Sequence, residues 1–198
     1  MATLLTSTQK AFIAATSTWL VVSFAANVCI IVVIMRMKKM RTVTNMFLGN
    51  LALTDIILIA FAIPLQLHDV THSNNYYESS TECRVVMSLP LLCITCSIYT
   101  MVALAEERYR AIVLQPPRLM TTRVAMTTLF FSWCAALVVC LTTFLQYNTR
   151  TAQHGNVTFN LCTNVMPYAF RLTHGVVVLC VSYIIPQVSC ICNYCVQT

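Results

Sequence analysis

Residues 85–110, VVMSLPLLCITCSIYTMVALAEERYR, decide how this chain folds. The stretch 85–105 carries no charged side chain, and its length is about the 20 residues that a helix needs to cross a bilayer. Charged residues then follow at once: Glu106, Glu107, Arg108 and Arg110. We therefore expect a membrane-spanning helix that ends in an acid–arginine–tyrosine cluster, Glu107-Arg108-Tyr109.

The composition of the whole chain agrees with a membrane protein. Of its 198 residues, 58% are hydrophobic and only 9% are charged, whereas soluble domains average about 25% charged residues. So few charged groups cannot cover a surface that faces water. The net charge of +6 does not indicate binding to nucleic acid, because the basic residues lie between apolar runs.

Four more apolar segments accompany this helix. Together they predict an all-α membrane protein, a transmembrane helix bundle with five spans in contact with the lipid bilayer. The chain has three glycines and no linker-like tract, so one bundle is expected rather than two domains. The predicted spans cover about residues 11–35, 46–67, 85–107, 124–147 and 175–195.

Basic residues near the ends of spans mark the cytoplasmic side of a membrane. The loops after the first and third spans carry Arg36, Lys38, Lys39, Arg41, Arg108, Arg110, Arg118 and Arg123. The opposite side carries only Lys10, Arg84, Arg150 and Arg171. We therefore expect the N-terminus outside and Thr198 inside. The glycosylation sequon at Asn156 falls on the predicted outer side.

Asp55 lies in the middle of the second span, where a carboxylate costs about 2.5–3.5 kcal/mol on insertion scales. We expect it to face the bundle interior, in a buried polar cluster with Asn27 and Ser97. For Asn27 and Asn50 a packing role is an equally good interpretation, because hydrogen bonds between membrane helices contribute about 0.6 kcal/mol each.

Glu107 and Arg108 can pair at the membrane boundary, and release of the pair would free a planar guanidinium for a protein partner. The alternative is a plain boundary at which basic residues mark the cytoplasmic face. Trp133 is expected to pack in the interior, and Pro186 to kink the fifth span.

Cys83 and Cys162 are the only two of the eleven cysteines in predicted outer loops, so we expect a disulfide between them. The CxxC pair of Cys93 and Cys96 lies inside an apolar helix and predicts core packing. No side chains form a pattern that fits an enzyme or a metal site, and no cofactor is expected.

Taken together, these residues resemble the first five helices of a rhodopsin-like (class A) G protein-coupled receptor. Asn27 is similar to the asparagine of the family's first span, and residues 50–55, NLALTD, to its NLAxxD stretch. Residues 107–113, ERYRAIV, are similar to DRYxAIV and follow Cys83 at the family's spacing. Further matching positions are Trp133, Cys162, Pro186 and Tyr194.

The resemblance implies roles for several residues. Arg108, Tyr109 and Tyr194 would take part in coupling to a heterotrimeric G protein, with Glu107 as the resting partner of Arg108. Asp55 and Ser97 match positions of a sodium site, which would also need helices that come later in the family.

The sequence departs from the family pattern at several positions. Ala26 stands where glycine is usual, Pro116 lies one residue late, and the first outer loop lacks its tryptophan. Spans six and seven of the seven-helix fold are absent from the sequence. We therefore expect a fragment, a truncated product or a receptor remnant that does not signal alone.

The ligand class is partly readable from the resemblance. Pro90 stands where amine receptors have an aspartate, and this disfavours an amine. Alternating Val157, Phe159 and Leu161 predict a strand where peptide-binding members place a hairpin. We expect a plasma-membrane receptor for an extracellular peptide. The acidic residues of the first outer loop would suit a basic peptide (Asp69, Glu78 and Glu82).

Two other functions remain open. One is a non-signalling form that associates with full-length receptor protomers. The other, more remote, is a small transporter or channel, which would need inverted repeats or midplane charges in several spans, whereas Asp55 is the only midplane charge.

Overall fold

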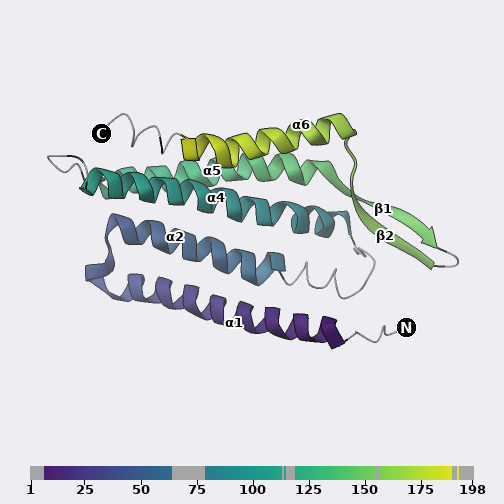
Figure 1. Ribbon diagram of the computed structural model, residues 1–198, viewed down its shortest axis with the longest axis horizontal. Coiled ribbons are helices and arrows are strands. Elements are labelled where there is room, and N and C mark those ends of the chain that lie inside the picture. The colour runs from purple at the N-terminus through teal and green to yellow at the C-terminus, as the bar shows by residue number, and fades with distance from the viewer. Residues whose placement is uncertain are drawn as a thin grey trace.

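The computed structural model describes residues 7–63, 79–112, 114, 119–154, 157–188 and 191. The described helices are elongated and run along one bundle (Figure 1). Five helical stretches are long and apolar enough to cross a membrane, which confirms the expected helical membrane fold. The principal helices are α1 (Ser7–Arg36), α2 (Val43–Ile57), α4 (Ser80–Ile112), α5 (Thr122–Gln146) and α6 (Tyr168–Leu179).

Shorter elements connect or extend these helices. A 3₁₀ turn, η1 (Lys38–Met40), lies between α1 and α2, and π-helical turns extend α2 (η2, Leu58–Ala62) and α6 (η3, Cys180–Ile184). Strand β1 (Tyr147–His154) pairs antiparallel with β2 (Val157–Asn164). The hairpin that they form extends beyond one end of the bundle (Figure 1). The strand expected before Cys162 is therefore present.

The starts of two helices differ from the hydropathy prediction. Helix α4 begins at Ser80 and α6 at Tyr168, both earlier than residues 85 and 175, where the charge-free stretches start. Charged side chains near these ends, such as Arg84 and Arg171, are long enough to leave the apolar layer. His174, expected in or beside a loop, therefore lies in α6.

Threonine side chains define the starts of two helices. Thr42 accepts a hydrogen bond from the backbone N–H of Asn45 at 3.3 Å, and so caps α2. Thr121 accepts one from the backbone N–H of Val124 at 3.4 Å and caps α5. Such caps satisfy backbone donors that the first helical turn leaves unpaired.

Large apolar side chains cover the outside of the bundle. Trp19 is 73% exposed, Phe131 is 65% exposed and Val138 is 65% exposed. Soluble monomers rarely expose apolar surface on this scale, whereas lipid is the natural surroundings of such side chains. Burial is limited to the seams between helices, where Phe47, Ala103 and Ala125 form a core cluster.

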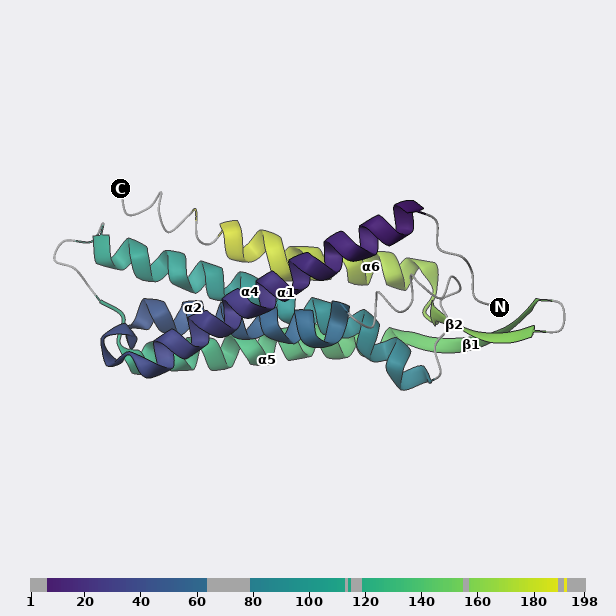
Figure 2. The same cartoon turned by 90° about the horizontal axis from the view of Figure 1, so that it is seen from below.

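Helix α4 is the central element of the bundle. It contacts α2, α5, β1 and η3, which are spread along its length. Helices α1 and α2 lie on one side of it and α6 on the other, and α1 crosses the bundle obliquely (Figures 1 and 2). Cys93 and Cys96, on α4, are buried, as expected from a core-packing role.

A hydrogen-bonded network around Asn50 joins three helices. The Asn50 amide nitrogen donates to Thr100 Oγ1 on α4 at 2.9 Å. The Trp133 indole N–H of α5 donates to Asn50 Oδ1, also at 2.9 Å. Asn50 is buried and Trp133 half-buried, so the expected interior role of this tryptophan includes a specific polar contact. For Asn50, the packing interpretation is the one that the structure supports.

Pro186 follows the π-helical turn η3. Proline has no backbone N–H, so the carbonyl of Ser182, four residues earlier, loses its helical donor. Turn η3 contains Ser182, whose Oγ accepts a hydrogen bond from Thr95 Oγ1 at 3.4 Å. The irregular backbone therefore lies where side chains of α4 and η3 make a polar contact.

We predict that Asn50→Ala destabilises the bundle more than Asn27→Ala. The first change removes the hydrogen bonds to Thr100 and Trp133 and a weaker one to Cys96 Sγ, about 1–2 kcal/mol in total. Asn27 is a matched control, because among the described residues its amide bonds only to the Ser23 carbonyl of its own helix. Thermal unfolding in detergent, followed by circular dichroism, measures both changes; equal losses would contradict the role of the network.

Candidate functional site

The acid–arginine–tyrosine cluster lies at the end of α4 that is remote from the hairpin. Arg108 Nε is 3.6 Å from Glu107 Oε2. The Arg108 side chain is 56% exposed, whereas that of Glu107 is only 10% exposed. Tyr109 is buried. Of the three residues, the arginine is therefore the one available to another molecule.

Thr44, at the start of α2, is a further residue of this site, which the sequence analysis missed. Its Oγ1 donates to Glu107 Oε2 at 3.1 Å, the same oxygen that faces Arg108. The acid is thus held from a second helix. The sequence signal was weak: a hydroxyl just after the basic loop, 63 residues away from its partner.

The geometry makes the Arg108 pair easy to break. An exposed ion pair contributes only about 0–1 kcal/mol, because water and salt screen it. Glu107 keeps its bond to Thr44 when Arg108 leaves, so no buried carboxylate is left without a donor. Arg108 can therefore exchange one acceptor for another at little cost.

The expected buried cluster of Asn27, Asp55 and Ser97 is not formed. Asp55 is exposed and its carboxylate bonds to none of the described residues. Asn27 bonds within its own helix, and Ser97 shares a 2.8 Å hydrogen bond with Thr54. The prediction that Asp55 faces the interior was wrong. Five residues turn a helix by about 140° beyond one full turn, so Asp55 points away from the α4-facing side that Asn50 occupies.

These positions do not fit a sodium site as they stand. A sodium ion needs several oxygen ligands directed at one point, whereas here Asp55 is exposed, Asn27 bonds within its own helix and Ser97 bonds to Thr54. Among the described residues, no group of three or more His, Cys, Asp or Glu side chains could hold a metal ion.

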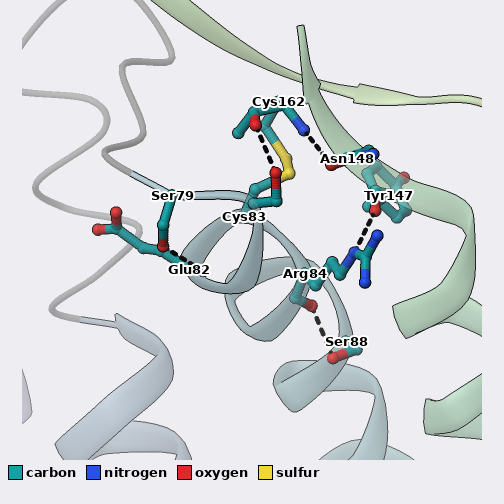
Figure 3. The surroundings of a disulfide bond; sticks show 10 residues. Ser79, Glu82, Cys83, Arg84, Ser88, Tyr147, Asn148 and Cys162 are labelled. Carbon is teal, nitrogen blue, oxygen red and sulfur yellow. Dashed lines mark hydrogen bonds between the residues drawn. A yellow bond between two sulfur atoms is a disulfide. The ribbon is translucent and has the colours of Figure 1, made fainter.

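At the other end of α4, a disulfide joins Cys83 to Cys162 of β2, with a Cα–Cα distance of 5.5 Å. This is the pair that the sequence predicted. Arg84 Nε donates to the Tyr147 carbonyl at 2.9 Å, and the Arg84 guanidinium lies over the Phe144 ring. As Figure 3 shows, the disulfide and the arginine hold both strands against the start of α4.

A cavity of about 310 Å³ lies at the base of the hairpin, and side chains of α4, α5 and α6 line it. Its polar lining is rich in hydrogen-bond donors: Gln146, Asn164, Arg171 and His174. Asn164 Nδ2 donates to Gln146 Oε1 at 3.2 Å, and His174 Nε2 lies 2.9 Å from Thr142 Oγ1. The cavity can therefore receive carbonyl or carboxylate groups from a ligand.

Some predicted sites fall outside the described residues. These are Tyr194, the sequon asparagine Asn156, Pro116 of the second basic loop, and Asp69 and Glu78 of the first outer loop.

We predict that Cys83→Ser lowers the unfolding temperature and loosens the hairpin. The bond closes a loop of 79 residues, so the chain-entropy model gives a loss of up to about 4–5 kcal/mol. Cys29→Ser is the control, because Cys29 is a free, exposed cysteine of α1. The measurement is thermal unfolding with and without reductant. Alkylation of Cys83 and Cys162 without prior reduction would show that the bond is absent.

We predict that Glu107→Gln speeds chemical modification of Arg108 by a dicarbonyl reagent by up to about fivefold, the limit for an exposed pair. Thr44→Val should have a smaller effect in the opposite direction, because Glu107 then loses its donor from α2 and depends more on Arg108. Mass spectrometry of the modified peptides gives the rate at each arginine. Glu106→Gln is the control, because Glu106 bonds to Arg110 instead; if it accelerates Arg108 equally, the local pairing is not the cause.

Comparison with known proteins identifies the family. Residues 26–197 match the sequence profile of the 7 transmembrane receptor (rhodopsin family). The Substance-P receptor of Rattus norvegicus is 31% identical over 77% of this chain and 41% of its own length. Bombesin receptor subtype-3 of Ovis aries is 30% identical over 83% of this chain and 43% of its own length. Neuropeptide FF receptor 1 of Rattus norvegicus is 29% identical over 72% of this chain and 33% of its own length.

The chain spans only about a third to two fifths of the length of these curated relatives. Even so, the family profile covers most of the chain, and the five apolar helices, the disulfide and the exposed arginine fit it. The chain is a multi-pass membrane protein that belongs to the rhodopsin family of 7 transmembrane receptors.

Proposed function

We propose that this chain forms part of a peptide receptor of the plasma membrane. In this proposal an extracellular peptide binds at the hairpin end, and a heterotrimeric G protein contacts the Arg108 end. The observation that carries it is the placement of both sites on one helix, α4. The donor-rich cavity includes Leu91 near its start, and Arg108 lies near its end.

Three observations support a peptide as the ligand. The relatives are named as receptors for substance P, bombesin and neuropeptide FF. The hairpin of two eight-residue strands forms a wall beside the cavity, large enough to contact an extended chain. The donors of Arg171 and His174 would complement the carbonyl groups or the carboxylate of a peptide.

The distribution of basic residues supports the orientation. Among the described residues, the end that includes Arg108 carries Arg36, Lys38, Lys39, Arg41, Arg110 and Arg123 as well. The hairpin end carries Lys10, Arg84, Arg150 and Arg171. Because basic residues favour the cytoplasmic side, the hairpin and the start of α1 would face outside.

Arg108 suits a contact with a G protein. Its guanidinium is always charged and presents five N–H donors in a planar fork, which can bind carbonyl groups of a partner's backbone. Because the ion pair with Glu107 is weak, Arg108 can leave this carboxylate and bind a partner instead.

The test uses a chimera in which residues 1–188 are joined to the C-terminal part of the rat Substance-P receptor. The ligands are substance P, bombesin and neuropeptide FF. We predict peptide binding that Arg171→Ala weakens, and nucleotide exchange on a G protein that Arg108→Ala lowers more than about tenfold, as for a lost charged contact. Lys39→Ala removes a charge at the same membrane face and should change neither.

The 198-residue chain alone should drive no exchange. Robust exchange by this chain, or an Arg108→Ala chimera that couples normally, would overturn the proposal. If the chain changes the surface level of a co-expressed full-length receptor and the chimera binds no peptide, a non-signalling association with receptor protomers explains the data instead.

A further inference from the structure

A second cavity, of about 560 Å³, lies between α4 and α5 towards the Arg108 end of the bundle. Its size is within the range of about 300–1,000 Å³ that is usual for small-molecule sites. Most of its wall is apolar, with Val102 and Ala103 from α4 and Val124, Phe131 and Ala135 from α5.

The cavity is separate from the proposed G protein contact. Its charged residues on α4 are Glu106 and Arg110, which are four positions apart and so share one face of the helix. Arg108 is two positions from each of them and therefore points to the opposite face, because each residue turns a helix by about 100°.

The cavity runs from the membrane boundary into the apolar layer. Charged residues begin at Glu106, which marks the end of the charge-free part of α4. Tyr99, at the other end of the lining, is seven residues deeper, or about 10 Å along the helix. A molecule that fills the cavity must therefore have a polar end and an apolar body, and the surrounding lipid supplies such molecules.

The deeper polar groups of the lining already have partners. Ser132 Oγ donates to the Thr128 carbonyl, Thr128 Oγ1 to the Val124 carbonyl, and the Tyr99 hydroxyl to the Val181 carbonyl. The donors of these hydroxyls are therefore engaged, and the spare N–H donors and the charged acceptor of the lining lie at the boundary, in the pair of Glu106 and Arg110.

After their mutual bond, Glu106 retains one carboxylate oxygen as an acceptor, and Arg110 retains several N–H donors. Arg110 Nε donates to Glu106 Oε1 at 2.7 Å, and no other hydrogen bond joins either side chain to a described residue. The guanidinium has five N–H donors, and the carboxylate has a second oxygen. Because the two charges cancel, the pair favours a headgroup that itself carries both charges over one with a net negative charge.

We propose that this cavity binds a phosphatidylethanolamine molecule of the surrounding leaflet. The lipid phosphate accepts hydrogen bonds from Arg110, and its primary ammonium donates to Glu106. The negative phosphate thus meets the positive Arg110, and the positive ammonium meets the negative Glu106, so that both bonds are charge-assisted. One acyl chain fills the apolar part beside Phe131 and Ala135. Phosphatidylcholine has the same net charge but no N–H donor on its nitrogen, so it satisfies only Arg110.

The test uses the 198-residue chain in nanodiscs, with a photoactivatable phosphatidylethanolamine as the probe. Cross-linked peptides are mapped by mass spectrometry. Unlabelled phosphatidylethanolamine should compete roughly three- to tenfold better than phosphatidylcholine, the difference expected for one ordinary hydrogen bond, because phosphatidylcholine keeps the charge of its nitrogen and lacks only the N–H donor. Phosphatidylserine and a sterol are the other competitors. Adducts should concentrate on the cavity-facing residues of α4 and α5.

Two kinds of variant separate headgroup recognition from cavity volume. Glu106→Leu removes the acceptor and should bring the ethanolamine-to-choline ratio close to one, while Ala135→Phe should reduce adducts in the cavity for every lipid. Leu137→Phe is the matched control, because Leu137 is an exposed residue on another face of α5. Circular dichroism and the intact Cys83–Cys162 bond show that each variant is folded.

Equal competition by phosphatidylcholine would overturn the proposal. So would stronger competition by phosphatidylserine or by the sterol, or adducts that Leu137→Phe reduces as much as Ala135→Phe does. The inference requires only that these helices span a bilayer, so a failure of G protein coupling would leave it intact.

Discussion

The amide of Asn50 holds together three helices that hydrophobic burial cannot hold together. In water, apolar side chains drive helices to associate, but lipid tails are as apolar as the side chains themselves. Specific packing and hydrogen bonds between helices must then provide the contact. Asn50 uses its donor on Thr100 and its acceptor on Trp133, and so fixes α2 against both α4 and α5.

Helix α4 connects this network to both ends of the bundle. Its 33 residues would extend about 50 Å, more than the roughly 30 Å of the hydrocarbon layer, so both ends reach the polar boundaries. A disulfide fixes one end to the hairpin, and the other end carries the exposed Arg108 beside its weakly bound acid. The two ends differ in stability: one is covalently closed, and the other can change partners.

The charges near the Arg108 end divide into two environments around α4. Glu107 is nearly buried between Thr44 and Arg108, whereas Glu106 and Arg110 form an i,i+4 pair at the mouth of an apolar cavity. Asp55 has neither kind of support. An unpaired carboxylate in the apolar layer costs about 2.5–3.5 kcal/mol. A polar group that contacts Asp55 would therefore stabilise the bundle more than the same group in contact with another residue of α2.

The sequence alone determined the membrane-spanning helices, the Cys83–Cys162 pair and the strand before Cys162. These features follow from local hydropathy, from the alternation of apolar and polar residues, and from the side of the membrane on which each loop is expected. All three can be read from residues that are close together in the sequence. Only the tertiary structure decided that Asn50 is buried while Asp55 is exposed, and that Thr44 holds Glu107. Such contacts join residues 63 or 83 positions apart and depend on the rotation and packing of each helix. Hydropathy is nearly the same for every rotation of an apolar helix, so the sequence pattern could not choose among them.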